Sequence, residues 1–451
     1  MRKIFLFAVL CVVLPINISA QNFAEVTGTV TDSSGALVAG AAITVTNPGN
    51  NQSRNVQTND SGIYAIPYLP PGVYEIRVEK TGFKTSTRRD VTLDVGSVLR
   101  ANFQLEVGDN TQIIEVSAAA PLLTTENTAI GTVIENRRIV ELPLNGRDYL
   151  QLVSLSPNVV KEGSAGGSSG LQGGVRSQTS LSVAGQRLEY NRYTLDGVEN
   201  TDPNFNSYII HPSVDAVQEF KVQTGVYSAE FGRGASQINV STKAGNNDFH
   251  GTAFEFLRNS AMDAREWKQS TGNKNPFRRN NYGFTLTGPV WIPKLFNGKN
   301  RLFFMSNYEA LRDRLTTQGV GATATDAMRN GDFSGQRAIF DPQTRVFNSA
   351  GVAISAQPFP GNRIPINRFD PAALRLLTFY PAPNTASGGL ARNYVRNAVA
   401  PTDSDQFNQR IDFNESSNSS WFGRYSWGTD LQIPATTFQP DSRRIQTDVQ
   451  Q

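Results

Sequence analysis

Residues 229–245 read AEFGRGASQINVSTKAG, and this stretch decides the fold. Two glycines, Gly232 and Gly234, precede a run from Gln237 to Thr242 in which apolar and polar residues alternate. Alternation with a period of two predicts a β-strand. The glycines begin like a dinucleotide-binding loop, but Gln237 stands at the third glycine position and no helix is predicted after it. We therefore expect a tight turn that leads into a strand.

The residues before this strand predict short helices and further strands. Residues 135–160 combine a helical run, a proline break and a second helix from Asp148 to Ser154, whose spacing buries Tyr149, Leu152 and Val153. Residues 182–202 predict a hairpin that turns at Asp196 and Gly197. An alternating strand through Phe220 and Val222 then leads into residues 229–245. Together these elements predict a small α+β domain.

Residues 112–245 resemble the plug domain of TonB-dependent outer-membrane receptors. The resemblance lies in the DGV turn after Leu195 and in the strand, glycine pair and INVSTK that close the segment. We assign residues 108–245 to a plug, with Asp196, Gly197, Gly232 and Gly234 as its motif. The strings LPLNGRDY and AEFGRGASQINVSTKAG resemble the Oar-like branch of these receptors. Siderophore specificity is not implied, because residues 163–174 form a Gly- and Ser-rich tract where a plug loop is expected.

A short extended run, residues 112–117, precedes the plug. In TonB-dependent receptors a mobile strand at this place pairs with the periplasmic energy-coupling protein. The resemblance therefore implies a coupling strand made of Ile113, Ile114, Glu115 and Val116. Such pairing is β-augmentation, in which backbone hydrogen bonds supply the affinity. An ordinary interdomain strand explains the same residues, and both interpretations stay open.

Residues 22–107 predict a β-sandwich of about seven short strands separated by turns. In residues 73–78 the alternation places Tyr74, Ile76 and Val78 on the core side. Residues 26–47 and 58–84 resemble the carboxypeptidase regulatory-like domain, which implies a transthyretin-like or carbohydrate-binding-like fold. A structural spacer and a module that binds glycan or protein are both compatible with this resemblance. Asp32 and Asp60 lie in predicted turns, which explain these residues without a calcium ion, so we assign no ion site.

From residue 246 to residue 451 the sequence changes to alternating segments of about ten residues, the length of a tilted transmembrane strand. The predicted strands are 249–259, 281–290, 301–311, 406–414 and 421–429. In the last segment Trp421, Tyr425 and Trp427 share one face, while Phe422, Arg424 and Ser426 share the other. Aromatic residues facing lipid and polar residues facing inward are typical of outer-membrane barrels. A soluble sheet with one wet face has the same local pattern, and the preceding plug favours the barrel.

Residues 312–400 carry no sustained alternation, and we expect them to form a long extracellular loop. Five strands cannot close a barrel, since a plugged transporter needs about 22 strands. We therefore expect the chain to be the N-terminal fragment of a longer receptor.

The first twenty residues resemble a secretory signal peptide, with Arg2 and Lys3 before an apolar run and a small-residue cleavage site that ends at Ala20. Cleavage there removes Cys11, the only cysteine, and excludes disulfides and thiolate metal sites. With 42 basic and 39 acidic residues, no charge excess favours nucleic acid. The chain has only two histidines, so an acid-base or metal centre would have to consist almost entirely of carboxylates, and the sequence favours a function other than catalysis. The G-x-S-x-G match at 166–170 lacks the preceding apolar strand that a nucleophile elbow requires. No catalytic residue, metal or cofactor is predicted.

The sequence thus predicts a mainly β protein of the outer membrane: a sandwich, an α+β plug and the first strands of an incomplete β-barrel. The expected function is TonB-energised uptake of a large nutrient, with a glycan as one candidate. The expected partners are a TonB-type periplasmic protein, outer-membrane lipid and an extracellular ligand. The alternative is a surface or export-linked structural protein that binds protein or polysaccharide through its sandwich.

Overall fold

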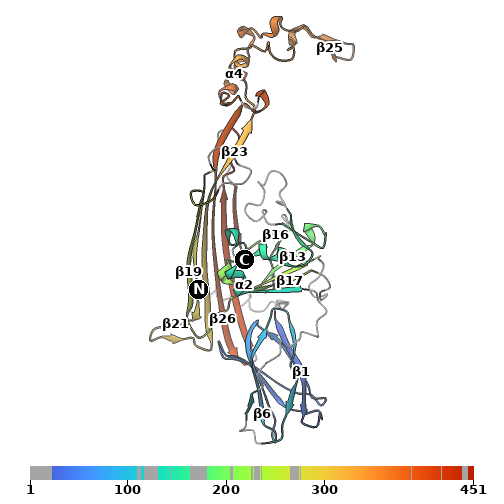
Figure 1. Ribbon diagram of the computed structural model, residues 1–451, viewed down its shortest axis with the longest axis vertical. Helices are drawn as coiled ribbons and strands as arrows, with labels where there is room; N and C mark the ends of the chain where they lie inside the picture. Colours follow the sequence, from blue (N-terminus) through green and yellow to red (C-terminus); the bar gives the residue numbers. More distant parts are fainter. Residues whose placement is uncertain are drawn as a thin grey trace, which may run out of the picture.

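The computed structural model shows three bodies: a sandwich, a plug and a tall antiparallel sheet against which the plug packs (Figure 1). The described residues are 23–108, 113–115, 131–142, 144–162, 180–203, 207–224, 227, 234, 236–264, 274, 276–386, 389–417, 419–438 and 445–451. The expected signal peptide at 1–20, Val116, Gly232 and the tract at 163–174 lie outside these residues. No helix of the described part is long and apolar enough to cross a membrane.

The sandwich consists of two sheets. One holds β1 (Ala24–Asp32), β4 (Ile63–Leu69), β7 (Val98–Arg100) and β8 (Phe103–Leu105). The other has the order β3 (Gln52–Gln57), β2 (Ala42–Asn47), β5 (Gly72–Glu79), β6 (Thr85–Leu93) and β9 (Ile113–Glu115). The predicted core residues Tyr74, Ile76 and Val78 are buried, which confirms the alternation. Gly28 leaves room for the segment between β7 and β8, because a Cβ there would lie 2.0 Å from the Ala101 carbonyl oxygen.

The plug is built on a five-stranded sheet. Its order is β10 (Gly131–Glu135), β17 (Val217–Gln223), β18 (Ser236–Thr242), β13 (Asn191–Leu195) and β14 (Val198–Glu199). Smaller elements surround it: α2 (Asn136–Glu141), the hairpin β11 (Val159–Glu162) and β12 (Ser180–Val183), and the pair β15 (Thr201–Asp202) and β16 (Ser207–Tyr208). The predicted second helix is a 3₁₀ helix, Tyr149–Leu155, and it buries Tyr149, Leu152 and Val153 as expected.

Backbone geometry restricts the residue type at two places in the plug, the β13–β14 turn and Gly234. The β13–β14 hairpin turns at Asp196 and Gly197, whose φ angles are 51° and 83°. Asp and Gly tolerate this left-handed region better than most residues, so the DG pair suits the turn. Gly234 precedes β18, and a Cβ there would lie 2.8 Å from the Tyr190 carbonyl oxygen. Every residue of β18 is buried, so the predicted alternation does not mark a solvent face.

The tall sheet has six antiparallel strands in chain order. They are β19 (His250–Asn259), β20 (Phe277–Pro289), β23 (Leu302–Gly321), β26 (Tyr394–Ser416), β27 (Ser419–Gln432) and β28 (Ile445–Gln450). The sequence predicts the first five and misses β28. In β27 the side chains of Arg424 and Ser426 are buried, whereas Trp421 is 63% and Tyr425 50% exposed, as predicted. Phe422, predicted on the inner face, is 41% exposed, and Trp427, predicted on the outer face, is partly buried. The hairpin β21 (Trp291–Ile292) and β22 (Phe296–Asn297) caps one turn.

The loop expected at 312–400 is longer at both ends than the connection in the structure. β23 and β26 stay paired without a register shift from Leu302↔Phe413 to Gly321↔Tyr394, so the connection spans 322–393. The backbone ladder extends the strands where side chains no longer alternate, which is why the sequence pattern missed them. The connection holds α3 (Asp326–Arg329), β24 (Val346–Phe347), β25 (Ala353–Ser355) and α4 (Pro371–Leu377), at the far end of the molecule from the sandwich (Figure 1).

Candidate functional site

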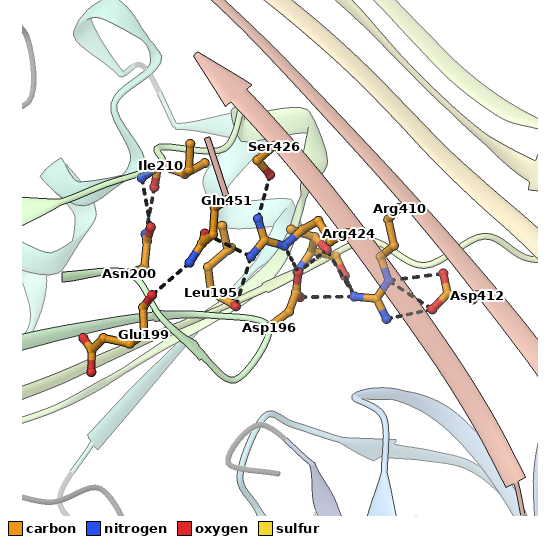
Figure 2. A network of polar contacts seen from close by, with 11 residues as sticks. Leu195, Asp196, Glu199, Asn200, Ile210, Arg410, Asp412, Arg424, Ser426 and Gln451 are labelled. Carbon is orange, nitrogen blue, oxygen red and sulfur yellow. Dashed lines mark hydrogen bonds and ion pairs between the residues drawn. The ribbon is translucent and has the colours of Figure 1, made fainter. Parts of the chain in front are cut away.

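The turn of the plug hairpin inserts a carboxylate between two arginines of the tall sheet (Figure 2). Asp196 Oδ1 lies 3.1 Å from Arg410 Nη1, and Asp196 Oδ2 lies 3.0 Å from Arg424 Nε. The three side chains are 3%, 10% and 5% exposed, respectively. This buried cluster, Asp196 with Arg410 and Arg424, joins the plug to β26 and β27.

Further bonds fix the geometry of this cluster. The Thr242 backbone N–H and hydroxyl each donate to Asp196 at 2.8 Å, which ties the turn to the end of β18. Arg410 also pairs with Asp412 at 2.8 Å and lies over the Phe422 ring, 4.5 Å from its centre. Two guanidinium groups therefore face two carboxylates, and the buried charge balances.

In a second contact between the plug and the tall sheet, the plug contributes an arginine instead of a carboxylate. Arg147, from the LPLNGRDY string, pairs with Asp215 inside the plug, and its Nε lies 3.7 Å from Glu309 of β23. Its guanidinium carbon sits 4.0 Å and 5.0 Å from the ring centres of Phe254 and Phe256 on β19. Cation–π contacts of this kind strengthen as water is excluded. The plug is thus held to the sheet by a buried anion at one point and a buried cation at another.

A cavity of about 580 Å³ lies between the plug and the sheet. Its plug side consists of residues around Asp148 and His211, and its sheet side of residues from β20, β23, β26 and β27. Two of the pairs on its wall are Arg279 with Asp313, where Arg279 Nε donates at 3.0 Å, and His211 with Asp148, at 3.1 Å. Gln151, Gln406 and Gln432 add amides. The lining also includes apolar side chains, and its carboxylates outnumber its arginines: Asp148, Glu309, Asp313, Asp405 and Asp430 against Arg147 and Arg279.

The sandwich is attached to both other bodies. The Val95 backbone N–H donates to the Glu219 carboxylate of β17, and Lys221 Nζ donates to the Gly96 carbonyl oxygen at 3.0 Å. On the side of the tall sheet, Asn51 and Asn247 both donate to the Asn300 side-chain oxygen, at 2.8 and 2.7 Å. The sandwich therefore has a fixed place beneath the plug and the sheet.

Glu219 makes the sandwich–plug contact sensitive to pH. Burial, helped by Asp94 and Glu135, raises the pKa of Glu219 to about 7, against the bond from Val95 and the charge of Lys221. A group whose pKa rises on folding binds a proton as the protein folds, so stability falls as pH rises from 4.5 to about 7 and stays lower above. We expect Glu219→Gln to raise the melting temperature at about pH 8 and leave it unchanged near pH 4.

The matched control is Glu79→Gln, since Glu79 pairs with Arg77 on the exposed side of the same sandwich. Its melting temperature should follow the parent at both pH values. A Glu219→Gln protein that melts like the parent at about pH 8 would contradict the assigned role of this carboxylate.

The structure distributes the predicted site residues over different places. Asp196 and Gly197 form the turn at the plug–sheet contact, and Gly234 lies inside the plug. Ile113, Ile114 and Glu115 form β9 at the edge of the sandwich, so the sandwich sheet extends past the boundary expected at residue 107. Sequence reasoning missed Arg410 and Arg424 as partners of Asp196. Inward-facing arginine in a predicted barrel strand was the available signal.

In the described part of the chain, no three His, Cys, Asp or Glu side chains are arranged to hold a metal ion. The buried carboxylates of the contacts described above are instead occupied by arginines and backbone N–H groups. The arrangement holds one domain against another.

Two family models match the chain. The carboxypeptidase regulatory-like domain matches residues 25–106, and the outer membrane beta barrel domain matches residues 241–451. Among curated proteins, the TonB-dependent transporter Oar of Myxococcus xanthus is 28% identical over 285 residues. That match covers 60% of this chain and 25% of the relative, so the chain spans about a quarter of the relative's length.

Among solved structures, similar chains include a ferric enterobactin receptor (PfeA) mutant from Pseudomonas aeruginosa and the outer membrane transporter YddB from Escherichia coli. They are 13% and 12% identical, with TM-scores of 0.37 and 0.40. Each match covers 68% of this chain and 34% of the other. TM-scores this low carry no argument about ligand or mechanism.

The family models agree with the sandwich and the tall sheet, and the curated relative agrees with the Oar-like strings of the plug. The chain is therefore homologous to the TonB-dependent transporter Oar. In this chain a carboxypeptidase regulatory-like domain precedes an outer membrane beta barrel domain, and the protein is one of the outer membrane.

Proposed function

We propose that the protein is a receptor and transporter for TonB-energised uptake of a large nutrient. The observation that carries this proposal is the buried cluster of Asp196 with Arg410 and Arg424. Buried ion pairs contribute little net stability but are costly to break one partner at a time. A plug held by such pairs can occlude a pore at rest and rearrange as a unit under force.

The ligand class we favour is a glycan. The chamber of about 580 Å³ presents amides and charged groups that already have partners in the protein. A neutral ligand rich in hydroxyl groups can bond to these groups without breaking a buried ion pair. A strongly anionic ligand would meet the excess of carboxylates on this wall and would compete with Asp313 for Arg279. The cavity thus supports carbohydrate over a highly anionic ligand.

The chemistry of this proposal is binding and gating, without catalysis. Ligand binds in the chamber and at the loop 322–393, the plug occludes the pore, and a TonB-type periplasmic protein pulls on the strand at Ile113–Glu115. The G-x-S-x-G match at 166–170 lies outside the described residues and has no part in the proposal.

The rival function, a surface protein that adheres through its sandwich, is less compatible with the arrangement. The sandwich lies at the opposite end of the tall sheet from the loop 322–393 (Figure 1). It is also bonded to the plug through Glu219 and to the sheet through Asn300. In the proposed orientation, with the loop 322–393 outside, the sandwich beneath the plug would face the periplasm.

A pair of substitutions at residue 114 tests transport in a version with a complete barrel. Ile114→Pro removes a backbone N–H and should disrupt strand pairing, whereas Ile114→Val should be mild. With fluorescently labelled oligosaccharides as probes, we expect both variants to bind at the cell surface like the parent. Only Ile114→Pro should lose energy-dependent accumulation, by at least about ten-fold.

Equal accumulation by the Pro and Val variants would remove the assignment of this segment as the coupling strand. If the parent itself shows no energy-dependent accumulation of any probe in the panel, carbohydrate transport is wrong.

A further inference from the structure

The strand assigned to coupling is already paired in the structure. β9 runs parallel to β6, with Thr85↔Ile113, Ser86↔Ile114 and Thr87↔Glu115 as register partners. The opposite edge of β6 is taken by β5, and β9 is the terminal strand of its sheet. Three parallel pairs form a short ladder, and parallel pairing is slightly weaker per residue than antiparallel pairing. The pairing is therefore specific in register yet small enough to exchange.

The chain just before β9 is anchored in the sandwich. The Lys84 backbone N–H donates to the Glu106 carbonyl oxygen at 2.8 Å, and the Gly108 N–H donates to the Gly82 carbonyl oxygen at 3.1 Å. Lys84 and Glu106 also form an ion pair at 3.1 Å. Leu105, the last residue of β8, is fully buried in the sandwich core. Removal of β9 therefore leaves the sandwich strands before residue 108 in place.

The chain after β9 leads to the plug, whose first strand is β10. β10 is the edge strand of the plug sheet and pairs only with β17 there. The coupling strand thus lies between an anchor in the sandwich and the edge of the plug. A pull on β9 while it is paired with β6 is borne by the sandwich, which is bonded to the tall sheet through Asn51 and Asn300. Force passes along the chain from β9 toward β10 only after β9 has left β6.

We propose that the sandwich holds the coupling strand at rest, and that the periplasmic coupling protein must take β9 from the edge of β6 to act on the plug. The partner is an extended strand that competes for the backbone of residues 113–115. This inference rests on the proposed TonB-coupled function and adds a binding site, the edge of β6 at Thr85–Thr87, that regulates it.

A removable cross-link tests the proposal. Removal of the signal peptide also removes Cys11, the only cysteine, so introduced cysteines have no competitors. Ser86→Cys with Ile114→Cys joins register partners of β6 and β9. Neighbouring strands lie about 4.7–4.9 Å apart, within the Cα–Cα range of a disulfide. The probe is the purified periplasmic domain of the TonB-type protein, and its binding to the mature, detergent-solubilised protein is measured. Oxidation should weaken binding at least about ten-fold, and a reductant should restore it.

The matched control is Thr44→Cys with Arg77→Cys, register partners on β2 and β5 of the same sheet, which need not separate. Its oxidation should leave binding unchanged. Equal binding by the oxidised and reduced β6–β9 pair would overturn the inference and leave the coupling assignment intact. Failure of the β6–β9 pair to cross-link, under conditions that close the control pair, would overturn it as well. An unmodified parent that does not bind the probe would instead refute the proposed function, before any cysteine is introduced.

Discussion

Asp196→Asn is expected to lower the free energy of unfolding by about 3–5 kcal/mol, the range for removing one partner of a buried ion pair. Asn keeps the shape of the side chain and tolerates the φ of 51° at this turn, so the substitution isolates the charge. Arg410 keeps Asp412, but Arg424 loses its carboxylate while only 5% exposed. Denaturant unfolding in detergent, with protease sensitivity of the plug as a second readout, measures the effect.

The control for this variant is Glu199→Gln in the same hairpin. Glu199 pairs with Arg192, but the two side chains are 45% and 30% exposed. Exposed pairs contribute about 0–1 kcal/mol, so this variant should unfold close to the parent. If Asp196→Asn were as stable as Glu199→Gln, the buried cluster would not be what holds the plug to the sheet.

Tyr74→Ala is expected to destabilise the sandwich by about 3–5 kcal/mol, because it deletes a buried large aromatic side chain. Tyr74 is 2% exposed, and its hydroxyl donates to the Pro70 carbonyl oxygen at 2.7 Å. Tyr74→Phe keeps the ring and loses only the hydroxyl, which also bonds to Asn47, and each lost bond should cost about 0.5–1.5 kcal/mol. Thermal unfolding of the isolated sandwich, residues 22–115, gives both values.

Val73→Ala is the control on the same strand, since Val73 is 44% exposed on the opposite face. Val73→Ala should lower the free energy of unfolding of the sandwich by much less than Tyr74→Ala does. A non-cooperative melt of the parent segment would show that the sandwich does not fold alone, and a Tyr74→Ala protein as stable as Val73→Ala would contradict the alternation of β5.

Short-range pattern was enough to predict the faces of several strands. The side chains of Tyr74 and Ser426 lie where a period of two places them, because one face of each strand is buried. The turn at Asp196 and Gly197 was predictable because few residues tolerate its backbone angles. These features depend only on residues close in the chain.

The features that the sequence could not predict depend on distant residues. Arg410 lies 214 positions after Asp196, and nothing in either local pattern identifies its partner. The burial of both faces of β18 depends on what packs on each face of the plug sheet, which the strand itself does not encode. Likewise, residues 113–115 have the pattern of an edge strand, but only the fold identifies β6 as the edge that receives them.

The long β23–β26 ribbon also bears on how this protein can diversify. Its ladder keeps one register up to Gly321↔Tyr394, so the two ends of the insertion 322–393 stand side by side whatever the insertion contains. Lengthening a loop between fixed ends costs only about 0.6 kcal/mol per doubling. The paired strands thus tolerate different insertions at their tip. The connection can therefore change in length or sequence while the register of the sheet below it is kept.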